Sequence, residues 1–186
     1  MRTTRAIVAS LLLAGLCFSQ SSPAWASAEE AKFYLESARR MMQSHDLRGA
    51  RIQLFNASKS DPANPVVRIE LAKLHLAEGD PISAQAELIA ARQRGASEEM
   101  ITPVLVVALY NSGQVGEMLR EIKPGNRPPA IESAVRAYIG MASLAIGDLA
   151  NANKMISDAE RLDPNAFVPK VAHARLFLVS HKLGEA

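Results

Sequence analysis

The chain has 186 residues, with 21 Lys or Arg against 19 Asp or Glu, so its formal net charge at pH 7 is only +2. This balance offers no basic excess that would attract nucleic acid. A single Cys excludes an internal disulfide, and it lies in the N-terminal segment, which has a composition of its own.

Residues 1–26 are predicted to be a secretory signal peptide. Arg2 and Arg5 make a basic start, and the apolar run that follows, 6–18, is too short to span a membrane comfortably. Ala24-Trp25-Ala26 fits the small-x-small cleavage rule, so cleavage is expected after Ala26. The mature chain, 27–186, is then exported, and a bacterial periplasm is its expected location.

Two alternatives concern the same segment. In a lipoprotein Cys17 would be acylated, although that motif wants a small residue where Leu16 stands, and the segment could also be retained as a membrane anchor. Cleavage after Ala26 would remove the only Cys, the only Trp, two Arg and no acid, leaving 19 basic and 19 acidic residues. Membrane association is therefore expected only through a lipidated Cys17 or through a partner.

The rest of the chain repeats itself every 34 residues, as the spacing of Gly79, Gly113 and Gly147 shows. The stretch 76–95 is predicted to be the turn and second helix of a two-helix unit, because Gly79 suits a left-handed helix cap and Pro81 suits the first position of the next helix. Small and aliphatic residues recur in columns at the same period. In the first helix the column is Ala38, Ala72, Val106, Gly140 and Ala174; in the second helix the columns are Ala50, Ala84 and Ala152, then Leu54, Leu88, Ile122 and Ile156.

Five units follow one another, at about 29–62, 63–96, 97–127, 128–164 and an incomplete 165–186. The third unit departs most from the period. Its first helix, after an N-cap at Ser97, is apolar nearly all round and is expected to be buried on more than one side. Met118 takes the place of a small residue, and the segment 123–129, with its three prolines, is expected to cut the second helix short.

A 34-residue period with helix–turn–helix content resembles the tetratricopeptide repeat family, over about residues 31–186. The resemblance implies an all-α, right-handed α-solenoid of about four and a half repeats, in which small residues let neighbouring helices approach closely. The family's usual early Trp is absent, and its column holds Tyr34, Arg68, Thr102, Arg136 and Lys170. The alternative is a plain helical bundle with a chance period.

The sequence stops at the first turn of what would be the second helix of the fifth unit. We expect the chain to be the N-terminal piece of a longer protein, because solenoids normally end in a polar capping helix. The alternatives are a fifth helix that itself serves as the cap, or one that docks on a partner.

No catalytic motif is found in the sequence, so no enzyme activity, cofactor or metal is expected. There is no HExxH, phosphate-binding Gly loop or nucleophile elbow. His45 and His181 are repeat-equivalent turn residues and are expected to lie far apart, whereas His75 is expected in the core.

A helical array of this kind is expected to bind a protein or a peptide. Tetratricopeptide arrays typically present their first helices on a concave face, so the resemblance and the repeat register together predict a partner-binding face. Its residues are Arg39, Met42, Ile69, Lys73, Leu76, Val107, Tyr110, Met141, Leu144, Arg175 and Leu178. The three repeat-equivalent cations Arg39, Lys73 and Arg175 favour an extended or helical peptide with some acidic character. Alternatively, these cations are only solvated and the apolar residues pack on the second helices.

A narrower resemblance covers Val67–Gln114. The GD before the second helix, AxxEL at 84–88, A-x-x-x-G at 91–95 and the apolar helix ending in NSGQ are similar to early repeats of the tetratricopeptide lipoproteins of exosortase/PEP-CTERM exopolysaccharide systems. This resemblance implies an envelope scaffold in polysaccharide synthesis or export. The alternatives are a chaperone-like binder of envelope proteins, and an accessory domain of an enzyme whose catalytic part lies beyond Ala186.

Overall fold

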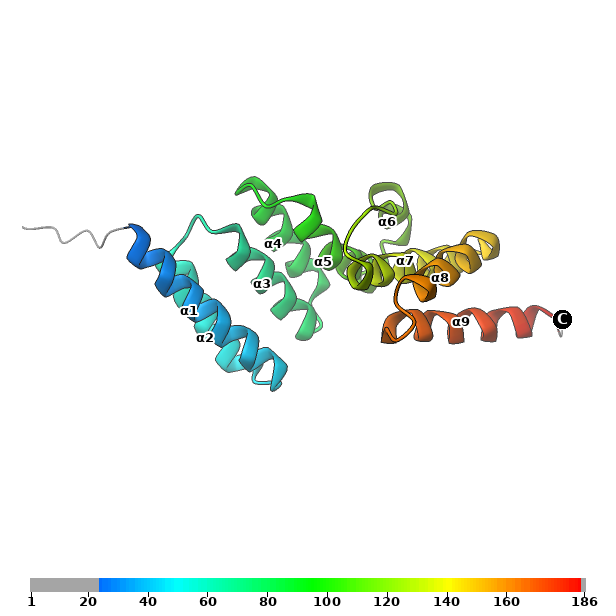
Figure 1. Cartoon of the computed structure of the whole chain (residues 1–186), viewed down its shortest axis with the longest axis horizontal. Helices are drawn as coiled ribbons and strands as arrows, with labels where there is room; N and C mark the ends of the chain where they lie inside the picture. Colours follow the sequence, from blue (N-terminus) through cyan, green and yellow to red (C-terminus); the bar gives the residue numbers. More distant parts are fainter. Residues whose placement is uncertain (1–23, 185–186) are drawn as a thin grey trace, which may run out of the picture.

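A computed structural model describes residues 24–184, and in this part of the chain the predicted helical solenoid is confirmed. Helical hairpins follow one another along an elongated array (Figure 1). The helices are α1 (Ala24–Gln43), α2 (Leu47–Ser60), α3 (Pro65–Ala77), α4 (Pro81–Gln93), α5 (Glu98–Asn111), α6 (Val115–Glu121), α7 (Pro129–Ala145), α8 (Leu149–Leu162) and α9 (Phe167–Gly184). The predicted signal peptide, apart from residues 24–26 at the start of α1, and Cys17 lie outside the described residues.

The turns inside the hairpins share one backbone conformation. Gly79, Gly113 and Gly147 have φ values of 79°, 75° and 82°, in the left-handed region where glycine carries no steric penalty. His45, which precedes Gly79 by 34 residues, takes the same conformation with a φ of 62°. The turn predicted at the equivalent His181 is wrong, because α9 continues as a helix through that position.

Three of the second helices begin with a capping Asp. The side chains of Asp46, Asp80 and Asp148 accept hydrogen bonds from the backbone N–H of the third residue of the helix, at 2.8, 2.9 and 3.0 Å. Such caps satisfy a helix donor that would otherwise lack a partner. Gln114 stands at this place in the third hairpin and makes no such cap, and α6, which follows it, has only 7 residues.

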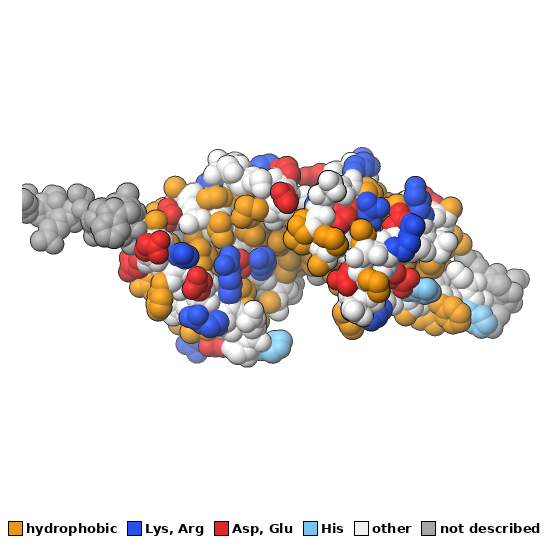
Figure 2. Space-filling view, viewed as in Figure 1, with side chains coloured by type: hydrophobic (Ala, Val, Ile, Leu, Met, Phe, Trp, Pro, Cys, Tyr) orange, Lys and Arg blue, Asp and Glu red, His pale blue; other side chains and the backbone are white. Residues whose placement is uncertain are grey.

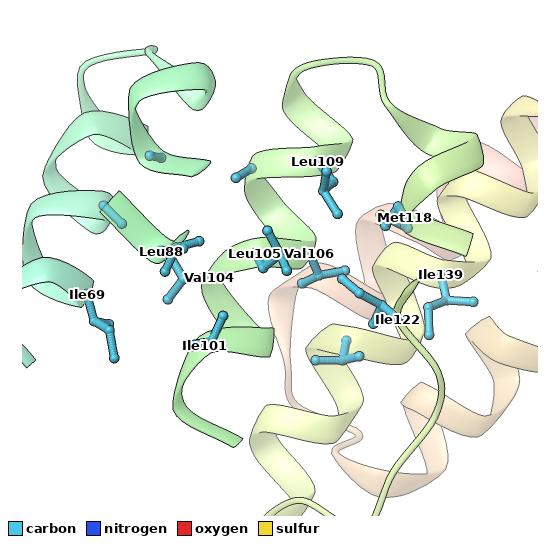
Figure 3. Close-up of a cluster of buried hydrophobic side chains, with 14 of the residues drawn as sticks. Ile69, Leu88, Ile101, Val104, Leu105, Val106, Leu109, Met118, Ile122 and Ile139 are labelled. Carbon is cyan, nitrogen blue, oxygen red and sulfur yellow. The ribbon is translucent and has the colours of Figure 1, made fainter. Parts of the chain in front are cut away.

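The hydrophobic core runs through the middle of the array, with α5 at its centre. Ile101, Val106 and Leu109 are at most 2% exposed, and together with neighbouring side chains they contact helices on both sides of α5. Figure 3 shows Val104 beside Leu88 on one side of α5, and Ile122, Met118 and Ile139 on the other. The prediction that this apolar helix is buried on more than one side is confirmed.

A buried carboxylate holds the irregular segment between α6 and α7. Glu132, only 2% exposed, accepts hydrogen bonds from the backbone N–H of Gly125 at 2.8 Å, from Arg127 at 2.7 Å and from Arg136 at 2.8 Å. As predicted, the second helix of the third unit ends early, at Glu121. The proline-rich segment that follows is thus tied to the first turn of α7.

Candidate binding groove

Two adjoining hollows follow the first helices of the hairpins, with volumes of about 440 and 340 Å³. We call them together the first-helix groove. Arg39, Glu70 and Lys73 border both hollows, and in Figure 2 basic side chains gather over α1 and α3 beside exposed apolar ones. The remaining lining residues come from α1, α3, α5 and α7: Met42, Gln43, Val66, Ile69, Ala77, Glu99, Met100, Pro103, Val104 and Ile131.

The centre of the groove is a buried carboxylate that binds two cations. Glu70 is 2% exposed, and its Oε1 accepts hydrogen bonds from Arg39 Nε at 2.9 Å, from Arg39 Nη2 at 2.7 Å and from Lys73 Nζ at 3.0 Å. A buried carboxylate requires such partners, because its desolvation is costly. Two of the three cations predicted for the binding face, Arg39 and Lys73, are therefore already paired. Together with Glu70 they keep one net positive charge.

The apolar part of the groove comes from the start of α5 and of α7. Met100 and Ile131 are 43% and 36% exposed, so their side chains remain accessible. Pro103 lies inside α5 and has no N–H to donate, which deprives the Glu99 carbonyl of its usual helical donor. This end of the groove thus combines accessible apolar surface with a backbone acceptor.

A second cluster of predicted residues lies farther along the array. The rings of Tyr110 and Tyr138 meet edge to face at a centroid distance of 5.4 Å, and Arg175 on α9 donates a hydrogen bond to the Tyr110 hydroxyl. Met141 accepts a weak contact from Arg175 at 3.8 Å. Burial, followed by the nearby Tyr110, raises the pKa of Tyr138, and Arg175 partly offsets that rise. Arg175 is thus engaged within the chain.

The predicted face is therefore divided, and its members differ in how far a partner can reach them. Arg39, Met42, Ile69 and Lys73 border the first-helix groove, although Ile69 is only 3% exposed. Met141 is 5% exposed and belongs to the core. The half-buried members are Leu76, Val107, Tyr110 and Leu144, and the exposed Leu178 lies at a separate hollow on α9.

Sequence reasoning missed four residues that shape the groove: Glu70, Met100, Pro103 and Ile131. Glu70 precedes Lys73 by one helical turn, which is a usable pairing signal. Its burial depends on Arg39, 31 residues earlier, and the repeat columns give no sign of that contact. The other three belong to the third and fourth units, where the regular register gives the least guidance.

Among the described residues, no group of three or more His, Cys, Asp or Glu is placed so that it could hold a metal ion. His75 is partly buried near Glu78, and His173 bonds to Glu160 at 2.8 Å. None of the helices described is long and apolar enough to cross a bilayer.

Comparison with known proteins identifies the fold. No protein-family model matches the chain, and no curated protein sequence is significantly similar to it. Among solved structures, PilF of Pseudomonas aeruginosa is similar, with a TM-score of 0.68 and 18% identity over 84% of this chain and 72% of PilF. The first tetratricopeptide domain of RPAP3 (Spaghetti), bound to the HSP90 peptide SRMEEVD, gives a TM-score of 0.38 and 16% identity over 84% of this chain and 95% of that one.

The chain therefore has the fold of a tetratricopeptide solenoid, a class of helical-repeat structure. The likeness to PilF at this level of identity establishes the fold alone. The narrower resemblance to exopolysaccharide systems stays a prediction.

Proposed function

We propose that the chain is a non-enzymatic scaffold that binds a segment of another protein in the first-helix groove. The observation that carries this proposal is the groove itself, in which accessible apolar side chains, Met100 and Ile131, lie beside charges held in place by Glu70. Apolar lining with a few fixed polar groups is what peptide and ligand sites have in common.

The lining also indicates the chemistry of the bound segment. Two cations, Arg39 and Lys73, face two carboxylates, Glu70 and Glu99, so the charges along the groove are balanced. An acidic ligand would therefore gain less binding free energy in this groove than it would gain from three unpaired cations. We propose an extended or helical segment that places one or two large apolar side chains against Met100 and Ile131.

We further propose that this scaffold acts in a bacterial envelope, in exopolysaccharide synthesis or export. The support is the predicted signal peptide, 1–26, and the similarity of Val67–Gln114 to repeats from such systems. The intact mass of the protein purified from its own cells tests the export step. A chain that begins at Ser27 supports it, an acylated chain that begins at Cys17 makes the protein a lipoprotein, and a chain that keeps Met1 contradicts cleavage after Ala26.

Site-specific photocrosslinking tests the groove. A photoreactive residue at Met100, inside the groove, is compared with one at Ile146, which is 57% exposed and lies at the end of α7 outside the groove. One discrete adduct from position 100 alone supports a scaffold with a dedicated partner. Many weak adducts from position 100 favour the chaperone-like alternative. The same adducts from both positions, or none, contradict binding in the groove.

A further inference from the structure

A hollow of about 460 Å³ lies where the first hairpin meets the second. Its walls come from α2 and α3, which follow one another in the array (Figure 1). The fully buried Leu54 and the half-buried Leu71 line it from the core side, and Ile52 and Phe55, 54% and 57% exposed, complete its apolar lining. We call it the α2–α3 hollow, and it shares no lining residue with the first-helix groove.

The hollow belongs to this junction between hairpins and does not follow from the repeat itself. The counterparts of Leu71 in the next two units, one and two repeat periods later, are Leu105 and Ile139. These two side chains are only 8% and 3% exposed, whereas Leu71 is half-buried. Arg68 likewise stands where the next unit has the shorter, buried Thr102. The repeat alone would therefore bury the residues that line the hollow from α3.

The polar side chains that line the hollow can all donate hydrogen bonds, and none of them is a carboxylate: Arg51, Ser58 and Arg68. Arg51 donates one hydrogen bond to Glu78, and Arg68 donates one to Glu87 at 3.1 Å. A guanidinium has five N–H donors, so both arginines keep donors to spare. The Ser58 hydroxyl makes no hydrogen bond among the residues whose side chains are described, 27–181. The hollow therefore offers donors to a ligand that supplies acceptors.

The charge around the hollow favours an anion. Lys59 Nζ lies 4.4 Å from the centroid of the Phe55 ring, beside the apolar lining. Three cations, Lys59, Arg51 and Arg68, thus stand against the two carboxylates that the arginines bind, so one positive charge is left over. An anion alone would gain little from the apolar lining, whereas an anion with an apolar body matches both features.

The places of the donors show how such a ligand lies. Arg51 and Ser58 are seven residues apart on α2, which corresponds to about 10 Å along a helix. Arg51 pairs with Glu78 at the C-cap of α3, so α2 and α3 run in opposite directions. Arg68, near the start of α3, therefore lies toward the Ser58 end. Two donors mark that end of the hollow, and an apolar stretch leads from them to Arg51.

We propose that the α2–α3 hollow binds an alkyl carboxylate, the chemical class of a medium-chain fatty acid. The carboxylate accepts hydrogen bonds from Arg68 and Ser58, and the alkyl chain lies along Phe55 and Leu71. The hollow has the volume of a small-ligand site, for which about 300–1,000 Å³ is usual. A helix of a protein is about 10–12 Å across, as wide as the hollow is long, so it would cover the mouth without filling the interior.

An NMR titration of the full chain tests the proposal, because amide shifts report both the affinity and the place of binding. Octanoate is the probe. Octanol, which has the same chain without the charge, and acetate, which has the charge without the chain, are the matched ligands. We expect saturable octanoate binding with shifts in α2 and α3, and an affinity for octanol or acetate that is lower by about tenfold or more. Equal affinity for octanol would overturn the proposal, since apolar contact alone would then explain the binding.

Two substitutions, each with a matched control, test the two parts of the site. Ser58→Glu puts a carboxylate where the ligand's should lie and should weaken octanoate binding by about tenfold or more. Asn153→Glu makes the same charge change at an exposed position on α8 and should alter the affinity by no more than about twofold. Phe55→Ala should weaken binding by about fivefold or more, because the alkyl chain loses apolar contact. Ile89→Ala, at the repeat-equivalent and similarly exposed place on α4, should leave the affinity within about twofold.

The melting temperature of each variant without ligand separates a lost site from a lost fold, and it should match that of the native chain to within a few degrees. Octanoate binding that neither Ser58→Glu nor Phe55→Ala weakens overturns the proposal, and so does the absence of saturable binding. Sedimentation tests another occupant. Self-association of the native chain that Ser58→Glu abolishes would make a second copy the occupant, and the free acid would be rejected.

Discussion

Arg39 on α1 and Glu70 on α3 are joined by two hydrogen bonds, of 2.9 and 2.7 Å, to a single carboxylate oxygen. Lys73 donates to the same oxygen at 3.0 Å, so one buried acid binds two cations of the predicted binding face. The pair links the first two hairpins at a point where α1 and α3 contact each other. It also sets the charge that a ligand meets in the first-helix groove.

Glu70→Gln should lower the free energy of unfolding by about 1–3 kcal/mol, because it leaves two neighbouring cations without their counter-charge. Arg39 and Lys73 are each 46% exposed, so water compensates part of the loss and the lower half of that range is expected. Urea unfolding measures the change. Added salt should reduce the difference in unfolding free energy between the native chain and the variant, since it screens the attraction in the native chain and the repulsion in the variant.

The matched control is Glu36→Gln on α1, since Glu36 is exposed and outside the groove. It should shift stability by no more than about 0.5 kcal/mol. If Glu70→Gln proves as neutral as this control, the buried carboxylate does not link the two hairpins energetically.

Glu132→Ala should cost about 3 kcal/mol or more, because it removes the acceptor for one backbone N–H and two arginines at once. Arg127 and Arg136 have only 16% and 22% of their side chains exposed, so water compensates little of the loss. Amide hydrogen exchange locates the effect: Gly125 should lose protection while α2 keeps it. An equal loss of protection at Gly125 and in α2 would mean that the substitution destabilises the whole chain. Glu132 would then have no specific role in holding the segment.

The repeat columns were sufficient to predict most of the fold. Ala50, Ala84 and Ala152 are fully buried, as a small-residue column at helix crossings requires. The left-handed turns at Gly79, Gly113 and Gly147 follow from the same period. Local signals and the 34-residue spacing carry this information, because each hairpin packs mainly on its neighbours.

The groove was harder to predict, because its decisive contacts join residues that share no column. Glu70 is buried through Arg39, while Val104, at the same place in the third unit, is part of the core. Glu132 owes its burial to a segment that interrupts the period. Buried charges of this kind depend on partners far away in the sequence, and a pattern of apolar residues does not reveal them.

Two glycine substitutions should have opposite effects. Ala occupies the place of Gly140 in the first two units, so the repeat consensus favours Gly140→Ala. The structure predicts a loss of about 1–3 kcal/mol, because the new Cβ would lie 2.6 Å from the buried Ile156 and 3.2 Å from the Ala152 carbonyl. Gly116→Ala on α6 meets no atom within 4 Å and should gain about 0.5–1 kcal/mol. Thermal unfolding of both variants shows whether each substitution raises or lowers the stability. A stability gain for Gly140→Ala would show that α8 shifts readily to make room for the new Cβ.

Asp80 should make the stability of the second hairpin depend on pH in the acidic range. Hydrogen bonds from the side chain and then the backbone N–H of Ser83 lower the pKa of Asp80 below its ordinary value of 3.8. A carboxylate with a depressed pKa contributes stability that is present above the unfolded value and lost as the pH falls through the folded one. Asp80→Asn keeps a capping acceptor but removes this titration. The melting temperature of the native chain should therefore fall relative to that of Asp80→Asn only below about pH 4. Parallel curves for the native chain and Asp80→Asn down to pH 2 would mean that the ionised cap adds nothing beyond its hydrogen bond.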